Sequence, residues 1–581
     1  MLRPSRSVSF VANSFVAELQ AYNPRMERPA FVLRWLFDSE HGDSNRLIPR
    51  WLFLRALGLI YFSAFYSLVF QIRGLIGPRG ISPAGEYLEA IAKSAGHTRY
   101  WLAPTLLWFS SGSHMLMALC WVGMAASLLI VLNWLPRPAL LVCFVCFLSL
   151  VSAASDFSGY QSDGMLLEAG LIAFFLAPAG IRPGWSKLRP PARAPVFLLV
   201  WECFRIYFGS GVAKIASGDP QWRNLTAMDE YYQNGPLPTW IGWYAQHLPH
   251  RVHVFASAAT LVLELGLIWI IFLPRRWRIA AFFLLTAWQI PVIFTANYTF
   301  LNYLVLILGI LLLDDRFLKP FLPRRWRENL PEQSESRRSG VEPTAIEPEA
   351  VEAETTGDSP VQVGIKPSRA LRGIKPWRDL GLACNAVLLT WLFYASAAQM
   401  VMALLPWMPL PTFPIQALEP FRVADRYGLF AVMTRGRYEI EFQGSDDGQT
   451  WMAYPFRYKP QDPSKAPGIY APYQPRFDWN LWFASLESWR SNSIVVRTEE
   501  RLLSSEADVI TLFAENPFPQ KPPKQVRAVL WRYWFTTLAE KRERGLWWRC
   551  ELLGLYAPTL ERGPEGKFNV VEWPAGTNPG L

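Results

Sequence analysis

The chain has 581 residues, of which 51% are hydrophobic and only 18% charged, against about 25% charged in an ordinary soluble domain. This composition excludes a wholly soluble protein, and 15% aromatic residues exclude disorder over most of the length. The 57 Lys and Arg, 47 Asp and Glu and 47 Pro need aqueous surroundings, so we expect a membrane part joined to an aqueous part. The net charge of +10 comes without a basic stripe interleaved with aromatics, so no nucleic acid partner is expected.

Apolar runs of nearly 20 residues recur through most of the first half of the chain, as transmembrane helices require. We interpret 1–50 as a cytoplasmic segment without a signal peptide, and 51–314 as a transmembrane helical domain of about eight spans. A ninth span is predicted at 381–405. The predicted spans, of which the fourth and eighth are the shortest, are roughly 52–72, 104–132, 139–155, 163–179, 195–214, 252–273, 279–296, 298–313 and 381–405.

The distribution of Lys and Arg between the loops predicts the orientation. If the N-terminus is cytoplasmic, the short inside loops carry eight basic residues in 26 positions, against six in the 68 positions of the outside loops. Cytoplasmic loops collect positive charge, so this orientation is favoured, and nine spans then place the C-terminal region outside. Between the eighth and ninth spans, 315–380 is predicted to be a cytoplasmic disordered linker, because most of it is rich in Glu, Ser, Pro and Thr.

The last part of the chain, 406–581, is predicted to be a non-cytoplasmic, mostly β domain, with a sandwich as one arrangement. Apolar and acidic side chains alternate over 438–442, a turn signal follows at 445–448, and alternation resumes over 452–458, which together predict a hairpin. The run 526–537 is aromatic and β-branched and predicts a further strand.

Ionisable side chains inside predicted spans are costly and usually face protein or a water-filled cavity. The spans contain Arg55, Asp163, Glu168, Glu202, Arg205, Lys214 and Glu264. Glu202 and Arg205 are three residues apart and share a helix face, so they could pair, as a packing clasp or in a functional site. Glu168 and Glu264 each lie beside a small residue that allows close helix approach, which leaves packing and function equally open.

Lys214 lies where the fifth span meets an outside loop. A lysine in partly apolar surroundings can serve as a base or nucleophile, whereas a lysine at a span end commonly extends its ammonium to the aqueous interface. His247, His250 and His253 have spacing that drifts around a helix, so interfacial histidines are expected rather than a metal site. No cofactor is expected.

Several long stretches resemble the lipase maturation factor family. They are 50–83, 162–178, 209–249, 516–537 and 545–558. The resemblance implies a polytopic membrane protein with a non-cytoplasmic C-terminal domain and a chaperone-like role in the folding and assembly of secreted lipases, without established catalysis. Animal members are in the endoplasmic reticulum membrane. The exported domain here has one cysteine, Cys550, which favours a bacterial inner membrane and speaks against disulfide-linked client handling.

A second resemblance concerns only the fifth span and its loop. The sequence Gly-Val-Ala-Lys-Ile at 211–215, followed by Asp219 and Trp222, is similar to the segment of vitamin K-dependent γ-carboxylases that holds their catalytic lysine. The resemblance implies that Lys214 would be that base, with Asp219 beside it. A related scaffold can keep its fold and lose or change its chemistry.

Two functions therefore remain. The first is a membrane-bound maturation factor that assists exported proteins, lipases among them, with membrane lipid as its surroundings and an exposed aromatic outer loop, including Trp222, against the client. The alternative is a membrane enzyme of the γ-carboxylase type that acts on a lipidic or peptide substrate through Lys214, with Asp219, Glu202 or Arg205 nearby. We favour the first, in which the protein is not an enzyme.

The orientation can be tested with reporter fusions. A periplasm- or lumen-specific reporter fused after Pro406 should be active, and the same reporter inserted within 340–360 should be inactive, because the ninth span separates the two positions. Activity of a cytoplasm-specific reporter at both positions would contradict the predicted topology.

Overall fold

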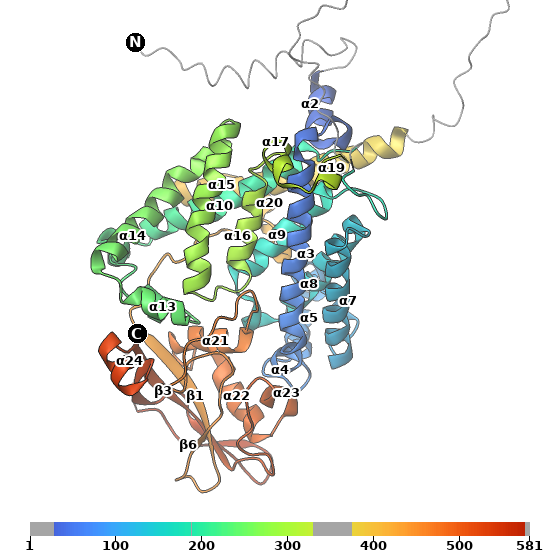
Figure 1. Ribbon diagram of the computed structural model, residues 1–581. Coiled ribbons are helices and arrows are strands. Elements are labelled where there is room, and N and C mark those ends of the chain that lie inside the picture. The colour runs from blue at the N-terminus through green and yellow to red at the C-terminus, as the bar shows by residue number, and fades with distance from the viewer. Residues whose placement is uncertain (1–27, 187–188, 329–374, 576–581) are drawn as a thin grey trace, which may run out of the picture.

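The computed structural model describes residues 28–186, 189–328 and 375–575. It consists of a helical bundle with an α+β domain against one end (Figure 1). Most of the predicted linker and the first half of the predicted N-terminal segment lie outside the described residues.

The bundle contains the long helices, and short helices lie in its loops. Its helices are α2 (Arg28–Phe37), α3 (Leu47–Val69), α4 (Ile72–Ile76), α5 (Ala84–Ala95), α6 (Arg99–Leu102), α7 (Ser113–Val131), α8 (Pro136–Ala153), α9 (Gln161–Leu176), α10 (Arg193–Ala216), α11 (Pro220–Arg223), α12 (Tyr231–Asn234), α13 (Trp240–Gln246), α14 (His250–Leu265), α15 (Arg275–Thr295), α16 (Leu301–Ile310), α17 (Asp315–Leu318), α18 (Arg324–Arg327), α19 (Lys375–Leu404) and α20 (Phe413–Gln416).

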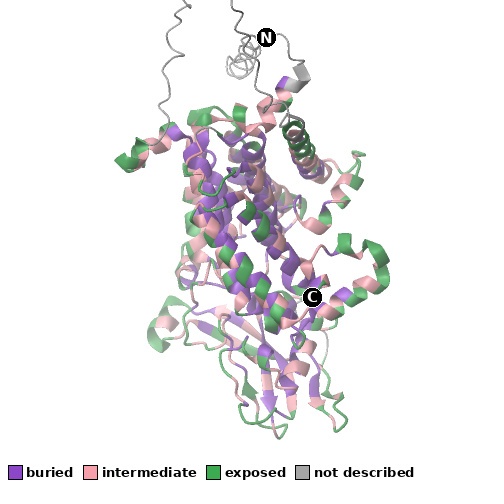
Figure 2. Ribbon diagram, turned by 90° about the vertical axis from the view of Figure 1, so that its right-hand side faces the viewer, coloured by how far each residue is buried: buried purple, intermediate pink, exposed green. Residues whose placement is uncertain are grey.

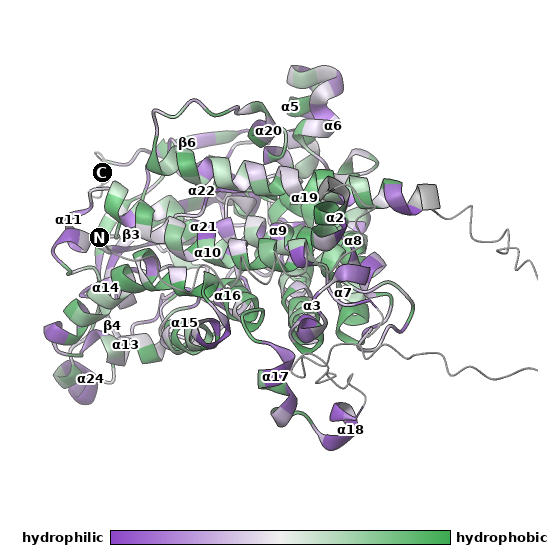
Figure 3. Ribbon diagram, turned by 90° about the horizontal axis from the view of Figure 1, so that it is seen from above, coloured by the Kyte–Doolittle hydropathy of each residue, from purple (hydrophilic) through white to green (hydrophobic). Residues whose placement is uncertain are grey.

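Seven helices in the described part of the chain are long and apolar enough to cross a membrane. They match seven of the nine predicted spans, and the predicted fourth and eighth spans are the shorter helices α9, of 16 residues, and α16, of 10 residues. Hydrophobic residues predominate along these helices (Figure 3), as expected of helices that cross a membrane. The chain is therefore a membrane protein with several apolar helices, as predicted.

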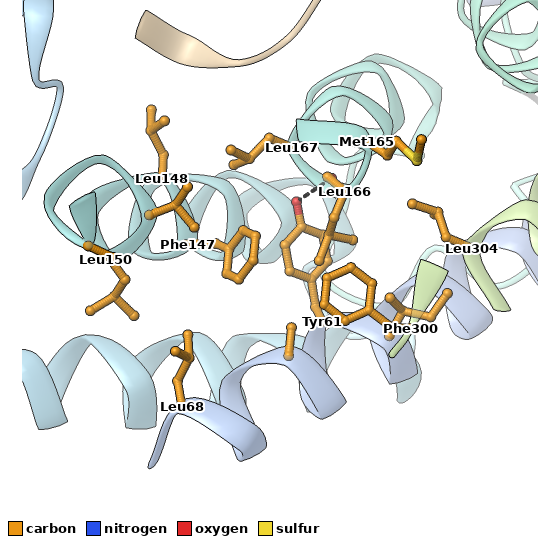
Figure 4. Packing of buried hydrophobic residues seen from close by; sticks show 14 of the residues in the cluster. Tyr61, Leu68, Phe147, Leu148, Leu150, Met165, Leu166, Leu167, Phe300 and Leu304 are labelled. Carbon is orange, nitrogen blue, oxygen red and sulfur yellow. Dashed lines mark hydrogen bonds between the residues drawn. The ribbon is translucent and has the colours of Figure 1, made fainter. Parts of the chain in front are cut away.

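Glycines let the central helices pack closely. A side chain at Gly123 of α7 would overlap the ring of Phe65 on α3, and one at Gly170 of α9 would overlap the hydroxyl of Tyr61. Small residues at such crossings are how helices associate where no water drives them together. The Tyr61 hydroxyl donates to the carbonyl of Leu166, 3.0 Å away, in the middle of this buried cluster (Figure 4).

The C-terminal part forms one six-stranded antiparallel sheet. Its strands are β1 (Arg437–Ser445), β2 (Met452–Ala453), β3 (Gln525–Phe535), β4 (Trp548–Leu555), β5 (Thr559–Arg562) and β6 (Phe568–Glu572). The order is β2-β1-β3-β5-β6, and β4 also pairs with β3. The predicted hairpin is β1 with β2, but β2 ends at Ala453, so the alternation over 454–458 does not continue as strand. The predicted strand after residue 526 is β3.

The turn between β1 and β2 is closed by an aspartate. Asp447 accepts from the backbone N–H groups of Thr450 at 2.7 Å and Gln449 at 2.8 Å. These bonds, with Thr450 foremost, hold the pKa of Asp447 below its ordinary value. The Ser-Asp-Asp-Gly sequence at 445–448 therefore forms the predicted turn, and the Asp447 side chain stabilises it.

Helices cover the sheet where a sandwich would have a second sheet. The helices of this domain are α21 (Arg476–Ser485), α22 (Ser493–Leu503), α23 (Ala507–Ile510) and α24 (Leu538–Arg544). Helix α21 packs on β1, and α22 packs on β3 and β5. The described residues thus form a single sheet with helices, because the buried residues of α22, Ile494, Val495, Thr498 and Leu502, recur at helical and not strand spacing.

The loop between α10 and α14, predicted to be an outer loop, is held between the bundle and the sheet. Trp243 of α13 packs in one cluster with Tyr533, Phe535 and Trp548 of the sheet. Buried residues continue from the bundle into the C-terminal domain, and we call this region of contact the joint (Figure 2). The prediction that the aromatic residues of this loop are exposed is wrong for Trp222 and Trp243, each 1% exposed, because the C-terminal domain covers them.

One buried ion pair links α9 to α21. Both carboxylate oxygens of Asp163 accept from the guanidinium of Arg476, at 2.7 and 2.8 Å. Arg476 also donates to the carbonyl of Phe157 at 2.8 Å. Asp163 is fully buried, and Arg476 is 1% exposed. This bidentate pair fixes the C-terminal domain to the bundle.

Asp163→Asn should lower the free energy of unfolding by about 3–5 kcal/mol, because it leaves the Arg476 charge buried without its counterion. Thermal unfolding of the full chain in detergent measures the loss. The double variant Asp163→Leu/Arg476→Met should recover much of it, because it removes both charges. A double variant no more stable than Asp163→Asn would contradict this account.

Candidate functional site

Residues 422–436 run past the C-terminal half of α10 without helix or strand and then enter β1. We call them the return segment, because they follow the last apolar helix and lead back over α10. Helix α10 faces this segment with side chains about one turn apart, namely Arg205, Ser210, Lys214 and Ser217. An irregular backbone is tolerated at this depth only where protein satisfies its polar groups.

The return segment satisfies its backbone groups with the side chains of α10. The carbonyl of Asp425 accepts from Arg205 at 3.0 Å, and the carbonyl of Leu429 accepts from the Lys214 ammonium at 3.0 Å. The N–H of Leu429 donates to the hydroxyl of Ser210 at 3.2 Å. The segment is thereby fixed along one face of α10.

Lys214 is 2% exposed and lies in a closed arrangement. Its ammonium donates to both carboxylate oxygens of Glu264 on α14, at 2.9 and 2.8 Å, and to Leu429. The Trp222 ring lies 5.1 Å from the ammonium nitrogen. The expectation of a lysine extended to the interface is therefore wrong. An ammonium has three N–H donors, and all three have acceptors here, so the arrangement stabilises a charged lysine and offers no free base.

Arg205 pairs with Glu168 of α9 and not with Glu202, although Glu202 precedes Arg205 by three residues on the same helix, α10. The hydroxyl of Tyr427 donates to the second carboxylate oxygen of Glu168 at 2.7 Å. Both carboxylate oxygens of Glu202 are buried without a hydrogen-bond partner among the described residues. The spacing of Glu202 and Arg205 indicated a shared face correctly, but Glu168 has the better position for the guanidinium.

Asp219 caps α11 and also holds the return segment. Its carboxylate accepts from the N–H of Gln221 at 3.0 Å and from the N–H of Met433 at 2.6 Å. The indole of Trp222 donates to the carbonyl of Phe430 at 2.9 Å. The structure therefore brings Lys214, Asp219 and Trp222 against the backbone of one segment.

Asp425 lies at the other end of the segment, against α9. A side chain at Gly164 would overlap its carboxylate, so the glycine makes room for this approach. Burial raises the pKa of Asp425 to about 6. Neither Asp425 nor Tyr427 was singled out in the sequence, because the segment has no period and its partners lie more than 200 residues away.

The three histidines are engaged in separate bonds. His250 and His253 each contact the carboxylate of Asp229, at 2.9 and 3.1 Å, and His247 contacts the carbonyls of Trp243 and Thr536. In the described ranges, no group of three or more His, Cys, Asp or Glu side chains is placed to hold a metal ion.

Comparison with known proteins identifies relatives along nearly the whole chain. A family model described as the lipase maturation factor transmembrane domain matches residues 48–320, and one described as the lipase maturation factor C-terminal domain matches residues 423–558. The chain is similar to lipase maturation factor 2 of Gallus gallus, with 32% identity over 89% of this chain and 82% of that protein. It is also similar to lipase maturation factor 1 of Bos taurus, with 30% identity over 91% of each chain.

The human protein named lipase maturation factor 2 is 30% identical over 89% of this chain and 83% of its own length. No solved structure matches. The second model begins within the return segment, at residue 423, so the segment is part of the matched C-terminal region.

Glu264→Gln should lower the free energy of unfolding by about 3 kcal/mol or more, because it leaves the Lys214 charge buried without a counterion. The double variant Lys214→Met/Glu264→Leu should regain most of that stability, since neither charge remains. Denaturant unfolding of the full chain in detergent checks both. If Glu264→Gln and the parent chain were equally stable, the pair of Lys214 and Glu264 would contribute nothing to the free energy of unfolding.

Proposed function

The chain belongs to the lipase maturation factor family, and on that premise we propose that it is a membrane-bound factor that assists the folding or assembly of exported lipases. The observation that carries the proposal is the match in both parts of the chain, membrane domain and C-terminal domain, to proteins named for that role at about 30% identity. The client would be an exported protein, and membrane lipid would surround the bundle.

For the orientation, we propose a cytoplasmic N-terminus and a C-terminal domain outside the membrane. The loop charges support it, and α2 and α17 lie at the end of the bundle opposite the sheet (Figure 1). The proposed domains are 1–50, 51–314, 315–380, 381–405 and 406–581. A bacterial inner membrane gains no support from the relatives described above, which are vertebrate proteins.

The proposed contact with the client is the outer part of the sheet. Strand β6 ends the strand order, so one of its edges is unpaired among the described residues. Many of its side chains and of those of β4 are exposed, with Val571 and Leu552 each 50% exposed. Trp573, which directly follows β6, is 60% exposed. Exposed apolar side chains next to a strand edge suit an unfolded chain, which can add a strand and bury apolar residues.

The enzyme alternative gains no support from the site. A catalytic lysine needs a free lone pair, whereas the three acceptors around Lys214 engage all the donors of a charged ammonium. The stable double variant Lys214→Met/Glu264→Leu should therefore still promote secretion of active lipase. A stable but inactive double variant would favour the enzyme.

Site-specific photocrosslinking tests the client role. A benzoylphenylalanine at Val571 of the full chain should capture a newly made, co-expressed lipase, whereas the same group at Glu543, an exposed residue of α24, should not. The crosslink should disappear when folded lipase is supplied instead, because only the unfolded client exposes apolar segments. Absence of any lipase crosslink from Val571, or equal crosslinks from both positions, would contradict the proposed contact.

A further inference from the structure

Two cavities lie side by side between the bundle and the C-terminal domain. The inner cavity, of about 180 Å³, is lined by membrane helices α10, α14, α15 and α16. The outer cavity, of about 360 Å³, lies between the outer ends of the helices and α21. Both are lined by Tyr231, Leu301, Leu429 and Phe430, so these four side chains are the wall between them. Together the cavities have the size of a small-molecule site, which is roughly 300–1,000 Å³.

The dividing wall contains a strained residue. Phe430 has φ of 56°, a left-handed conformation that is rare for a bulky side chain. Its ring packs against those of Tyr298 and Tyr231, with centroids 4.9 and 5.9 Å apart. Such conformations persist where surrounding contacts impose them and often lie at ligand sites. Here the left-handed backbone places the aromatic ring of Phe430 between the two cavities.

The charges around the cavities point to an uncharged ligand. Among the described residues, no Asp, Glu, Lys or Arg lines the outer cavity. The inner cavity has Lys214 and Glu264, which neutralise each other. An anionic or cationic group would therefore lose its hydration without gaining a counterion.

Three residues that line the outer cavity each have a buried polar atom without a partner among the described residues. The side-chain oxygens of Asn234 and Thr299 and the indole nitrogen of Trp479 have no hydrogen-bond partner among the described residues. Each of these three residues is at most 8% exposed. Such groups are costly to bury unless something bonds to them, and together they offer an acceptor, a hydroxyl and a donor. Hydroxyl groups of an uncharged ligand could form hydrogen bonds with all three, because a hydroxyl both donates and accepts.

We propose that the two cavities bind an uncharged single-chain amphiphile of the monoacylglycerol type. Its acyl chain would occupy the inner cavity, at the depth of the lipid hydrocarbon, and its glycerol hydroxyls would bond to Asn234, Thr299 and Trp479 in the outer cavity. The ring of Phe430 would move to let the chain pass. The site is an addition to the maturation role and does not require a client protein.

Binding of tritiated 1-mono-oleoylglycerol to the purified full chain in detergent tests the proposal. The lipid should bind saturably, with one molecule per chain. Val292→Phe, which fills the inner cavity from α15, should weaken binding at least about tenfold, since the ring and the acyl chain compete for one volume. Val262→Phe, the same change at a residue of α14 that is 56% exposed, should leave binding unchanged.

A second variant tests the headgroup position and guards against misfolding of the first. Thr299→Val removes an unpartnered hydroxyl at nearly constant shape, so the protein should unfold at the same or a higher temperature. Its affinity for the monoacylglycerol should fall about fivefold, which corresponds to one hydrogen bond. A charged lipid, oleate or lysophosphatidylglycerol, should compete poorly.

Unsaturable binding, equal affinities of Val292→Phe and Val262→Phe, or an unchanged affinity of Thr299→Val would each overturn the proposal. Competition by oleate as strong as by the neutral lipid would overturn the assignment of an uncharged headgroup. The experiment contains no lipase, so its failure leaves the proposed maturation role untouched.

Discussion

The structure depends on neutralising charges that lie among apolar helices. Removing an ion from water costs several kcal/mol even after the protein has relaxed, so each buried charge needs a partner with good geometry. Glu168 and Arg205 pair with each other; Tyr427 donates to Glu168, and Arg205 donates to the carbonyl of Asp425. Lys214 pairs with Glu264 and donates to the carbonyl of Leu429. The return segment contributes to both of these arrangements, so the bundle and the C-terminal domain share the contacts that neutralise them.

This dependence explains why the two parts form one body. The outer loop lies between them, with Trp222 bonded to the return segment and Trp243 packed on the sheet. Arg437 at the start of β1 donates to the carbonyls of Gln233 and Pro236 in the same loop, at 3.0 and 3.1 Å. Residues that a loop would ordinarily expose are therefore core residues of the joint. Surfaces for partners are left to the far side of the sheet and to the cavities at the joint.

The sequence predicted those features that repeat along the chain. Long apolar runs predicted the membrane helices, alternation predicted the β1–β2 hairpin, and charge inside apolar runs selected Glu168, Arg205, Lys214 and Glu264. It could not predict partners, because helix spacing relates only neighbours on one helix. Glu202 was the nearest candidate for Arg205, yet Glu168 on another helix forms the pair. The return segment has no period, so nothing in it indicated that its carbonyls would face α10.

The pair of Asp163 and Arg476 has a consequence for biosynthesis, because 313 residues separate its members. At 5–20 residues per second, about 15–60 seconds pass between synthesis of the acid and synthesis of the base. During that time α9 carries an unneutralised carboxylate at the membrane, and the insertion machinery must shelter or protonate it. A ribosome that stops early leaves this charge permanently without its partner. The carboxylate of Asp163 therefore gains its counterion only after synthesis has entered the last third of the chain, and a chain that ends before Arg476 keeps an unpaired charge in a helix of its bundle.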